Sequence, residues 1–212
     1  WVDTIHRPAV QSNINAEEVY KTIKYIKKTT PHILVFVGGV FATLCAEIII
    51  TACPEIDFVI LGDGEIPLKI LLDDYKMNGS VGEYEFVLSK NSITNKKAFI
   101  MQPDDFVKVS HKLLSSKELK NKYRARIYSS RGCCGNCSFC STNYCTNTAI
   151  RWRGRPISAV FDEVLSVYRD YGITSFYIND STLEDPGALG KERILEFCEY
   201  VKKQDIRFTF TS

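Results

Sequence analysis

The chain alternates between short apolar runs and segments with helical periodicity, and this alternation restricts the fold more than any other feature. Residues 33–37 and 57–61 are almost wholly apolar, which is typical of strands buried on both faces of a parallel sheet. The first run ends in Gly38 and Gly39, the second ends in the turn Gly62–Glu65, and a helical segment follows each. A repeated order of strand, turn and helix predicts an open parallel α/β sheet.

The same alternation resumes in the last third of the chain. We expect its strands and helices at 125–129, 157–171, 174–179, 192–204 and 206–211. Two strand–helix units and a third strand predict the beginning of a TIM-like barrel, in which catalytic groups gather where the strands end. A cysteine-rich loop follows the first of these strands, and the polar turn Asn179–Thr182 follows the second. We therefore expect the two loops to meet.

The intervening segment, residues 76–124, has no clear period. Residues 84–88 and 97–101 are expected to pair as a hairpin, and a lysine-rich stretch follows them. The domains expected from these patterns are the C-terminal part of a Rossmann-like domain at 1–75, a linker with a hairpin at 76–124, and the N-terminal part of a barrel at 125–212.

Two local patterns concern helix starts. Asn15, with Glu18 three residues later, predicts a capping box for the first helix. A basic cluster of Arg151, Trp152, Arg153 and Arg155 precedes a helix that carries Asp162 and Glu163. A salt bridge at the helix start or a solvated face is the expected role of these arginines, and a clamp for a substrate phosphate is the alternative.

The charge of the chain gives little reason to expect a polyanionic partner. Its 27 basic and 25 acidic residues leave a formal net charge of +2, so nucleic acid is not an expected partner. The most apolar stretch, 40–53, is too short to span a bilayer and contains Glu47, so we expect no membrane span and a cytoplasmic location. Because the chain begins at Trp1 and stops at Ser212 directly after an expected strand, we expect it to be truncated at both ends.

Three cysteines carry the strongest chemical signal. Cys133, Cys137 and Cys140 have the spacing C-x3-C-x2-C. Three thiolates this close together can hold three corners of a 4Fe–4S cluster and leave the fourth iron without a protein ligand. An iron with an open position can bind a small molecule and pass it an electron, which is a catalytic arrangement.

Two other readings of the cysteines stay open. Cys134, Cys137, Cys140 and Cys145 approach a ferredoxin pattern, although four residues rather than three precede Cys145 and no proline follows it. A zinc site usually pairs two short knuckles, and no second knuckle is present in the sequence. The remaining cysteines lie in apolar helical surroundings and are expected to be small core side chains: Cys45, Cys53 and Cys198.

Residues Ser130–Cys140 closely resemble the signature of the radical S-adenosylmethionine superfamily. The lead-in Ser-Arg-Gly resembles the branch that carries an N-terminal cobalamin-binding domain. The resemblance implies that Cys133, Cys137 and Cys140 ligate the cluster and that the open iron binds the amino and carboxylate groups of S-adenosylmethionine. It also implies that Phe139 lies near the adenine, with loop packing as the alternative.

The turn Asn179–Thr182 resembles the Asp-Asp-Thr-like segment of that branch, with Asn179 in place of the first acidic residue. The resemblance implies that Asp180 and the hydroxyl of Ser181 or Thr182 bind the amine of S-adenosylmethionine. The alternative is a polar turn that caps the next element.

Two segments of the front domain resemble the strand ends of a cobalamin-binding domain. Glycines there allow the backbone to approach a large ligand at the carboxyl edge of a parallel sheet. The residues that the resemblance assigns to cobalamin are Gly38, Gly39, Thr43, Gly62, Gly64 and Glu65. No Asp-x-His-x-x-Gly segment is present to supply a lower axial histidine.

The resemblance implies an enzyme that uses its reduced cluster to cleave S-adenosylmethionine into methionine and a 5′-deoxyadenosyl radical. With cobalamin bound, it implies methyl transfer to an unactivated carbon of a small-molecule or peptide substrate, with flavodoxin or ferredoxin as the electron donor. The alternatives are a radical oxidoreductase or cyclase with a vestigial cobalamin domain, and a non-enzymatic iron–sulfur electron carrier.

Overall fold

The protein is described by a computed structural model that covers most of its 212 residues. The described residues are 9–92, 96–111, 124–135, 137–142, 152–183, 187, 190–205 and 207–211, with side chains from residue 16 onwards. The chain forms two compact units, one of residues 1–101 with 139–147 and the other of residues 102–138 with 148–212.

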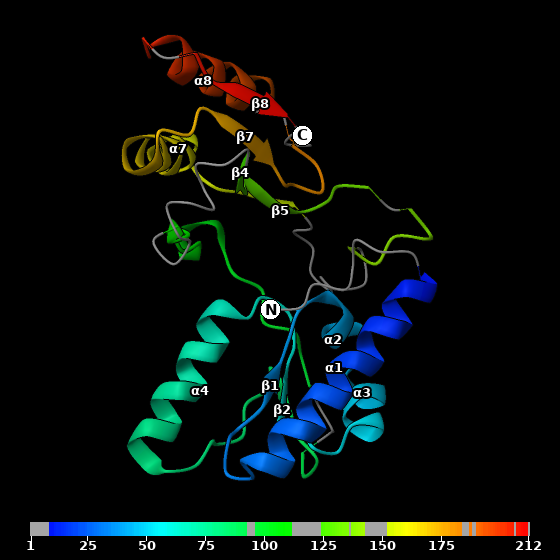
Figure 1. The fold of residues 1–212 in the computed structure, drawn as a ribbon. Helices are drawn as coiled ribbons and strands as arrows, with labels where there is room; N and C mark the ends of the chain where they lie inside the picture. Colours follow the sequence, from blue (N-terminus) through cyan, green and yellow to red (C-terminus); the bar gives the residue numbers. More distant parts are fainter. Residues whose placement is uncertain are drawn as a thin grey trace. The chain divides into compact units, whose positions relative to one another are not determined.

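The first unit has helices on both faces of a small sheet (Figure 1). Its strands are β1 (Phe36–Val37), β2 (Phe58–Ile60) and β3 (Val87–Leu88), in that spatial order. Its helices are α1 (Ala9–Thr29), α2 (Val40–Leu44), α3 (Ala46–Ala52) and α4 (Glu65–Asn78). β1 and β2 are parallel, as their continuous apolar sequences predict, and α4 lies on the opposite face from α1, α2 and α3.

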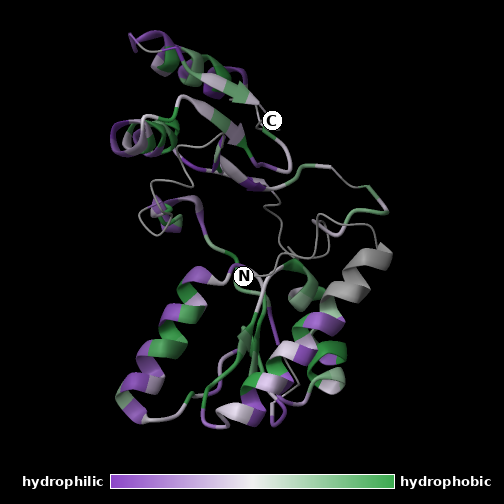
Figure 2. Ribbon diagram, viewed as in Figure 1, coloured by the Kyte–Doolittle hydropathy of each residue, from purple (hydrophilic) through white to green (hydrophobic). Residues whose placement is uncertain are grey.

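Strand β2 supplies both faces of this core. Val59 packs with residues of α1, α2 and α3, whereas its neighbour Ile60 packs with Leu71 of α4. Successive side chains of a strand point to opposite faces, so a run of apolar residues is needed where both faces are covered. The apolar colouring of the strands between the helices follows from this arrangement (Figure 2).

Residues 84–92 and 96–101 add to the first sheet. β3 pairs antiparallel with β2, matching Val59 to Leu88. The two segments of the expected hairpin meet where the Lys97 N–H donates to the Glu85 carbonyl at 2.8 Å, but Phe99 then forms a bridge beside Gly62. The buried side chains of Val87 and Leu88 explain why β3 joins the sheet, because they gain more contact there than in an isolated two-stranded hairpin.

Two local expectations in the helices are wrong. The first helix begins at Ala9, so Asn15 lies inside it and cannot be its N-cap. Cys198 is exposed on helix α8 (Gly190–Lys202), where its neighbours Glu196 and Glu199 face solvent, whereas Cys53 is fully buried as expected. Among the described residues, no helix is long and apolar enough to cross a membrane.

The second unit contains the expected start of a barrel. Its strands β4 (Ala125–Ile127), β7 (Ser175–Ile178) and β8 (Thr209–Thr211) are all parallel and adjacent in that order. Helices α7 (Ile157–Tyr171) and α8 (Gly190–Lys202) connect them (Figure 1). A two-stranded antiparallel ribbon of β5 (Ser130–Gly132) and β6 (Trp152–Gly154) flanks the cysteine loop, and a short 3₁₀ helix, η1, spans Pro103–Asp105.

Helix α7 holds this unit together. Its apolar face buries Val160, Phe161 and Val164 against the sheet, where they meet Phe176 of β7. The helix ends at Gly172, whose φ of 70° is a left-handed conformation that glycine adopts without strain. The packing of α7 against the sheet holds β4 and β7 in place, and with them the edge at which both strands end.

Candidate active site

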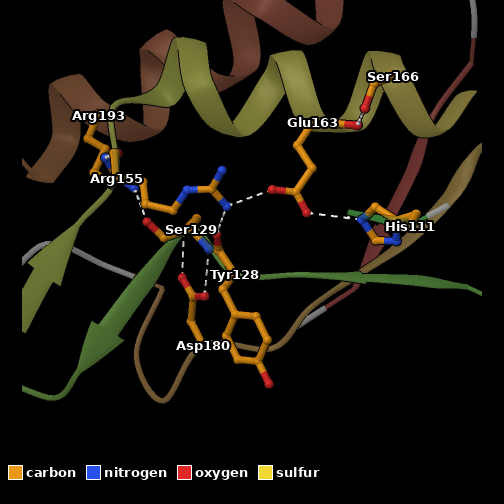
Figure 3. Close-up of polar contacts among 8 residues, drawn as sticks. All are labelled: His111, Tyr128, Ser129, Arg155, Glu163, Ser166, Asp180 and Arg193. Carbon is orange, nitrogen blue, oxygen red and sulfur yellow. Dashed lines mark hydrogen bonds and ion pairs between the residues drawn. The ribbon is translucent and has the colours of Figure 1, made fainter. Parts of the chain in front are cut away.

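The loops that follow β4 and β7 meet, as the sequence predicts. Asp180 accepts hydrogen bonds from the Ser129 N–H at 2.8 Å and from the Ser129 hydroxyl at 2.5 Å (Figure 3). The same carboxylate accepts from the Ser130 hydroxyl at 2.8 Å. Ser129 and Ser130 are each 1% exposed. A carboxylate with three donors binds the end of one strand firmly to the end of the next.

Cys133 lies within this contact. The Thr182 Oγ1 is 2.9 Å from the Cys133 Sγ, and the Gly135 N–H donates to the same sulfur at 3.3 Å. The hydrogen bonds with Thr182 and Gly135, and a smaller one with the Cys134 thiol, hold the pKa of Cys133 below its ordinary value of 9.0, although burial opposes this. The loop therefore favours the thiolate, which is the form that ligates metals.

A second thiol lies over the same glycine. A Cβ placed on Gly135 would be 3.4 Å from the Cys133 Sγ and 3.7 Å from the Cys137 Sγ. These are ordinary van der Waals separations, so the two sulfurs lie beside the same position of the loop. The chemistry and placement of these two donors fit an iron–sulfur cluster, although the described part of the chain contains no group of three side chains gathered for a metal.

The third cysteine and the neighbouring aromatic residue belong to a segment of the first unit, Phe139–Asn147. Cys140 is partly exposed. The Phe139 side chain is 90% exposed, so it does not pack into its own loop and is free to contact a ligand. Cys145, the fourth ligand of the ferredoxin-like alternative, lies outside the described residues.

The rest of the β7 loop divides into a bound and an exposed part. The Asn179 amide donates to the Tyr128 hydroxyl at 2.5 Å, whereas Ser181 is exposed. Of the five residues expected to bind S-adenosylmethionine, Asn179, Asp180 and Thr182 thus already make contacts within the protein. These contacts run to residues that precede the turn, Tyr128, Ser129, Ser130 and Cys133, and not to the next element, so they do not decide between cofactor binding and the capping alternative.

A buried ion pair lies behind the loops, and it is the salt bridge expected at the helix start. Arg155 approaches the carboxylate of Glu163 at 2.8 Å, and the His111 Nε2 lies 3.2 Å from its other oxygen (Figure 3). The Glu163 side chain is fully buried and that of Arg155 is 7% exposed, so this is not a solvated face. Arg155 also donates to the Tyr128 carbonyl at 2.7 Å, which connects the pair to the end of β4.

Arg193 was not singled out by the sequence, yet it completes the network. Its guanidinium donates to the carbonyls of Ser129 at 2.8 Å and Arg155 at 2.5 Å. It also lies over the Trp152 ring, 5.3 Å from the centroid. No sequence pattern marks such a residue, because its partners are backbone carbonyls 38 and 64 positions away.

In the first unit, Thr43 joins the two glycine turns assigned to cobalamin. Its hydroxyl donates to the Gly39 carbonyl at 2.8 Å and accepts from the Gly62 N–H at 2.9 Å. Gly39 has a φ of 99°, and no atom of the described residues lies within 4 Å of its Cβ position. The surface at Gly39 is therefore open to a ligand.

Gly62 is required for a different reason. A Cβ there would lie 2.1 Å from the Phe99 carbonyl oxygen, so the glycine permits the close approach of another backbone segment. Asp63 fixes that segment by accepting from the Met101 N–H at 2.9 Å. Gly64 and Glu65 form the N-cap and first residue of α4, at the same edge of the sheet.

The matches with known proteins cover both units. Residues 10–72 match the B12 binding domain family. An uncharacterized methyltransferase of Pyrococcus horikoshii is 27% identical over 205 residues, which are 92% of this chain and 42% of that protein. An anaerobic magnesium-protoporphyrin IX monomethyl ester cyclase of Synechocystis is also 27% identical, over 87% of this chain and 37% of that protein.

A solved structure has the same fold. It is the radical S-adenosylmethionine methyltransferase TsrM from Kitasatospora setae, determined with tryptophan substrate and a cofactor analogue. Its TM-score is 0.63 at 18% identity, over 89% of this chain and 37% of that chain. The chain spans about two fifths of the length of the relatives it matches.

Proposed function

We propose that this chain has a radical-generating function. These matches confirm its predicted relationship to the radical S-adenosylmethionine branch with an N-terminal cobalamin-binding domain. The α/β fold expected for that branch is confirmed as well. The second unit supplies Cys133 and Cys137 at the end of a barrel strand, whereas Cys140 belongs to a segment grouped with the first unit, which also supplies part of a cobalamin site.

One observation carries the proposal. The C-x3-C-x2-C loop begins where β4 ends, and the polar loop at the end of β7 contacts it through Thr182 and Cys133. Strand ends of a parallel barrel are where catalytic groups converge. A structural metal knuckle or a surface loop does not need this position.

The residues would share the work as follows. Cys133, Cys137 and Cys140 hold a 4Fe–4S cluster, whose chemistry when bound is the one-electron reductive cleavage of S-adenosylmethionine. Asp180 fixes the ends of the two strands and, with Asn179 and Ser181, faces the amine of the cofactor. The exposed ring of Phe139 contacts its adenine.

In the first unit, Gly38, Gly39 and Thr43 approach the corrin, together with Gly64 and Glu65. Gly62 shapes this surface indirectly, because it allows the segment at Phe99 to pack beneath it. We favour methyl transfer to an unactivated carbon as the reaction. Cyclisation is the second candidate, because the relatives include cyclases as well as methyltransferases. A small-molecule or peptide substrate, a flavodoxin or ferredoxin donor and a cytoplasmic location remain predictions.

The first test is electron paramagnetic resonance on the anaerobically reconstituted, dithionite-reduced chain, with and without S-adenosylmethionine. We expect a reduced 4Fe–4S signal that changes when the cofactor is added. A signal that ignores the cofactor would support four-thiolate ligation, and zinc without iron would contradict a cluster altogether. Cys137→Ala should abolish iron binding, whereas the matched variant Cys145→Ala should keep it.

A second test addresses cobalamin. After anaerobic incubation with hydroxocobalamin and desalting, a corrin absorption spectrum should remain with the chain, and Gly39→Trp should remove it by filling the open surface. Retention of a cluster without any corrin would favour the radical enzyme with a vestigial front domain.

A further inference from the structure

Thr182 makes a contact that the proposed binding of S-adenosylmethionine does not require. Its hydroxyl oxygen is 2.9 Å from the sulfur of Cys133, a residue 49 positions earlier in the chain. Either atom can donate while the thiol keeps its proton. A metal-bound thiolate has no proton, so with a cluster in place the hydroxyl must be the donor.

The backbone of Thr182 is held from two sides. Its carbonyl accepts from the Trp152 Nε1 at 2.9 Å and lies 3.0 Å from the Ser130 hydroxyl, whose single proton it shares with Asp180. Ser130 begins β5 and Trp152 begins β6, so both strands of the ribbon beside the cysteine loop contact Thr182. Since a β-branched side chain has few χ1 rotamers, fixing this backbone also restricts the hydroxyl.

The neighbouring Asp180 fixes the register of the loop after β7 relative to the residues that follow β4. It binds Ser129 and Ser130, and the Ser130 hydroxyl lies between the carboxylate and the Thr182 carbonyl. The loop of β7 therefore meets the cysteine loop through carboxylate, carbonyl and hydroxyl groups in a fixed register. Only the last of these reaches a proposed ligand of the cluster.

We propose that Thr182 is a positioning residue for the cluster: its hydroxyl donates to the Cys133 sulfur and is not a ligand of S-adenosylmethionine. This inference rests on the proposed function, since it assigns a role toward the cluster. Hydrogen bonds to cluster sulfurs stabilise the reduced, more negative state and so raise the reduction potential. Thr182 therefore makes the cluster easier to reduce.

The test compares Thr182→Val, which keeps the branched shape without the hydroxyl, with Thr182→Ser, which keeps the hydroxyl. Each full chain is reconstituted anaerobically, and the midpoint potential is measured by redox titration with paramagnetic resonance detection. For the valine variant we expect the ratio of reduced to oxidised cluster at a fixed potential to fall about fivefold to tenfold, as for the loss of an ordinary hydrogen bond. A tenfold change equals 59 mV for a one-electron couple.

The cofactor response separates the two roles of the hydroxyl. We expect the valine variant to keep the spectral change on addition of S-adenosylmethionine, and the serine variant to keep the wild-type potential. An unchanged potential in Thr182→Val would overturn the inference. A lost cofactor response in the same variant would also overturn it, because the hydroxyl would then be assigned to S-adenosylmethionine.

A measurement without iron keeps the inference separate from the proposed function. In the iron-free chain, the Gly135 amide donates to the Cys133 sulfur and should exchange slowly with deuterium. Thr182→Val should accelerate exchange at 130–135, and Thr182→Ser should not. If the wild-type chain takes up no iron, the proposed function fails, and unchanged exchange in the valine variant would independently refute the positioning role.

Discussion

The buried pair of Arg155 and Glu163 gives the sharpest test of how the second unit is stabilised. Glu163→Leu removes the carboxylate and leaves the guanidinium, which is 7% exposed, without its charged partner. Removing one member of a buried pair costs about 3–5 kcal/mol in the free energy of unfolding. The neighbouring Asp162→Leu on the same helix is exposed and should change stability by no more than about 0.5 kcal/mol.

The double variant Arg155→Met/Glu163→Leu should be more stable than Glu163→Leu alone. An apolar pair of similar size avoids the uncompensated charge, and its main remaining defect is the Tyr128 carbonyl that loses its donor. An unsatisfied buried carbonyl costs about 1–3 kcal/mol, so the double variant should recover roughly 2 kcal/mol.

Urea unfolding followed by tryptophan fluorescence measures these differences in the relevant unit. In a Trp1→Phe background, Trp152 is the remaining tryptophan and lies in the second unit. With a slope of about 1.5 kcal/mol per molar urea, Glu163→Leu should lower the midpoint by roughly 2 M or more. A loss below about 1 kcal/mol, or a double variant as unstable as the sum of its two single variants, would refute this reasoning.

Three further predictions concern turns and loops. Gly62→Ala should destabilise the first unit by at least about 2 kcal/mol more than the control Gly79→Ala, as measured by circular dichroism in urea. Both glycines have a positive φ, but only a Cβ at position 62 would meet a backbone oxygen at 2.1 Å. Asp180→Asn should lower the stability of the second unit by about 1–3 kcal/mol in the same fluorescence assay, since an amide has one acceptor oxygen for three donors; an unchanged midpoint would contradict this. The pKa of Asp74 lies below its ordinary value of 3.8, chiefly because the Gly82 N–H donates to the carboxylate. The Asp74 carboxylate therefore stabilises the fold at pH values above 3.8, and this stabilisation disappears as the pH falls through the lower pKa of the folded state. Asp74→Asn should therefore lose less stability than the wild type in an acid titration, and parallel curves would rule this out.

The sequence predicted those parts of the fold that depend on local patterns. The helix at Ile157–Tyr171 has the predicted bounds, because a proline precedes it and Gly172 ends it. The meeting of the cysteine loop with the turn at Asn179–Thr182 followed from the topology of parallel strands. Residues whose partners are distant backbone atoms, such as Arg193, leave no pattern in the sequence.

The glycine at position 62 shows a second limit of sequence reasoning. A glycine at the end of a strand predicts a close approach, and the sequence alone suggested that a cofactor makes it. In the structure the approaching group is the backbone of Phe99. The period of residues 84–101 is too weak to reveal that this segment returns to the sheet.

The separation of Cys133 from Thr182 has a consequence for synthesis on the ribosome. The two residues are 49 positions apart, so at ~5–20 residues per second the cysteine emerges roughly 2–10 s before its hydroxyl partner. Arg193, which holds the Ser129 carbonyl, follows later still. During that interval the nascent thiols have neither the polar loop nor the α8 arginine around them. For the proposed cluster we therefore expect iron and sulfide to be loaded after the loop at Thr182 has been synthesised, and air to damage the growing chain more than the finished one.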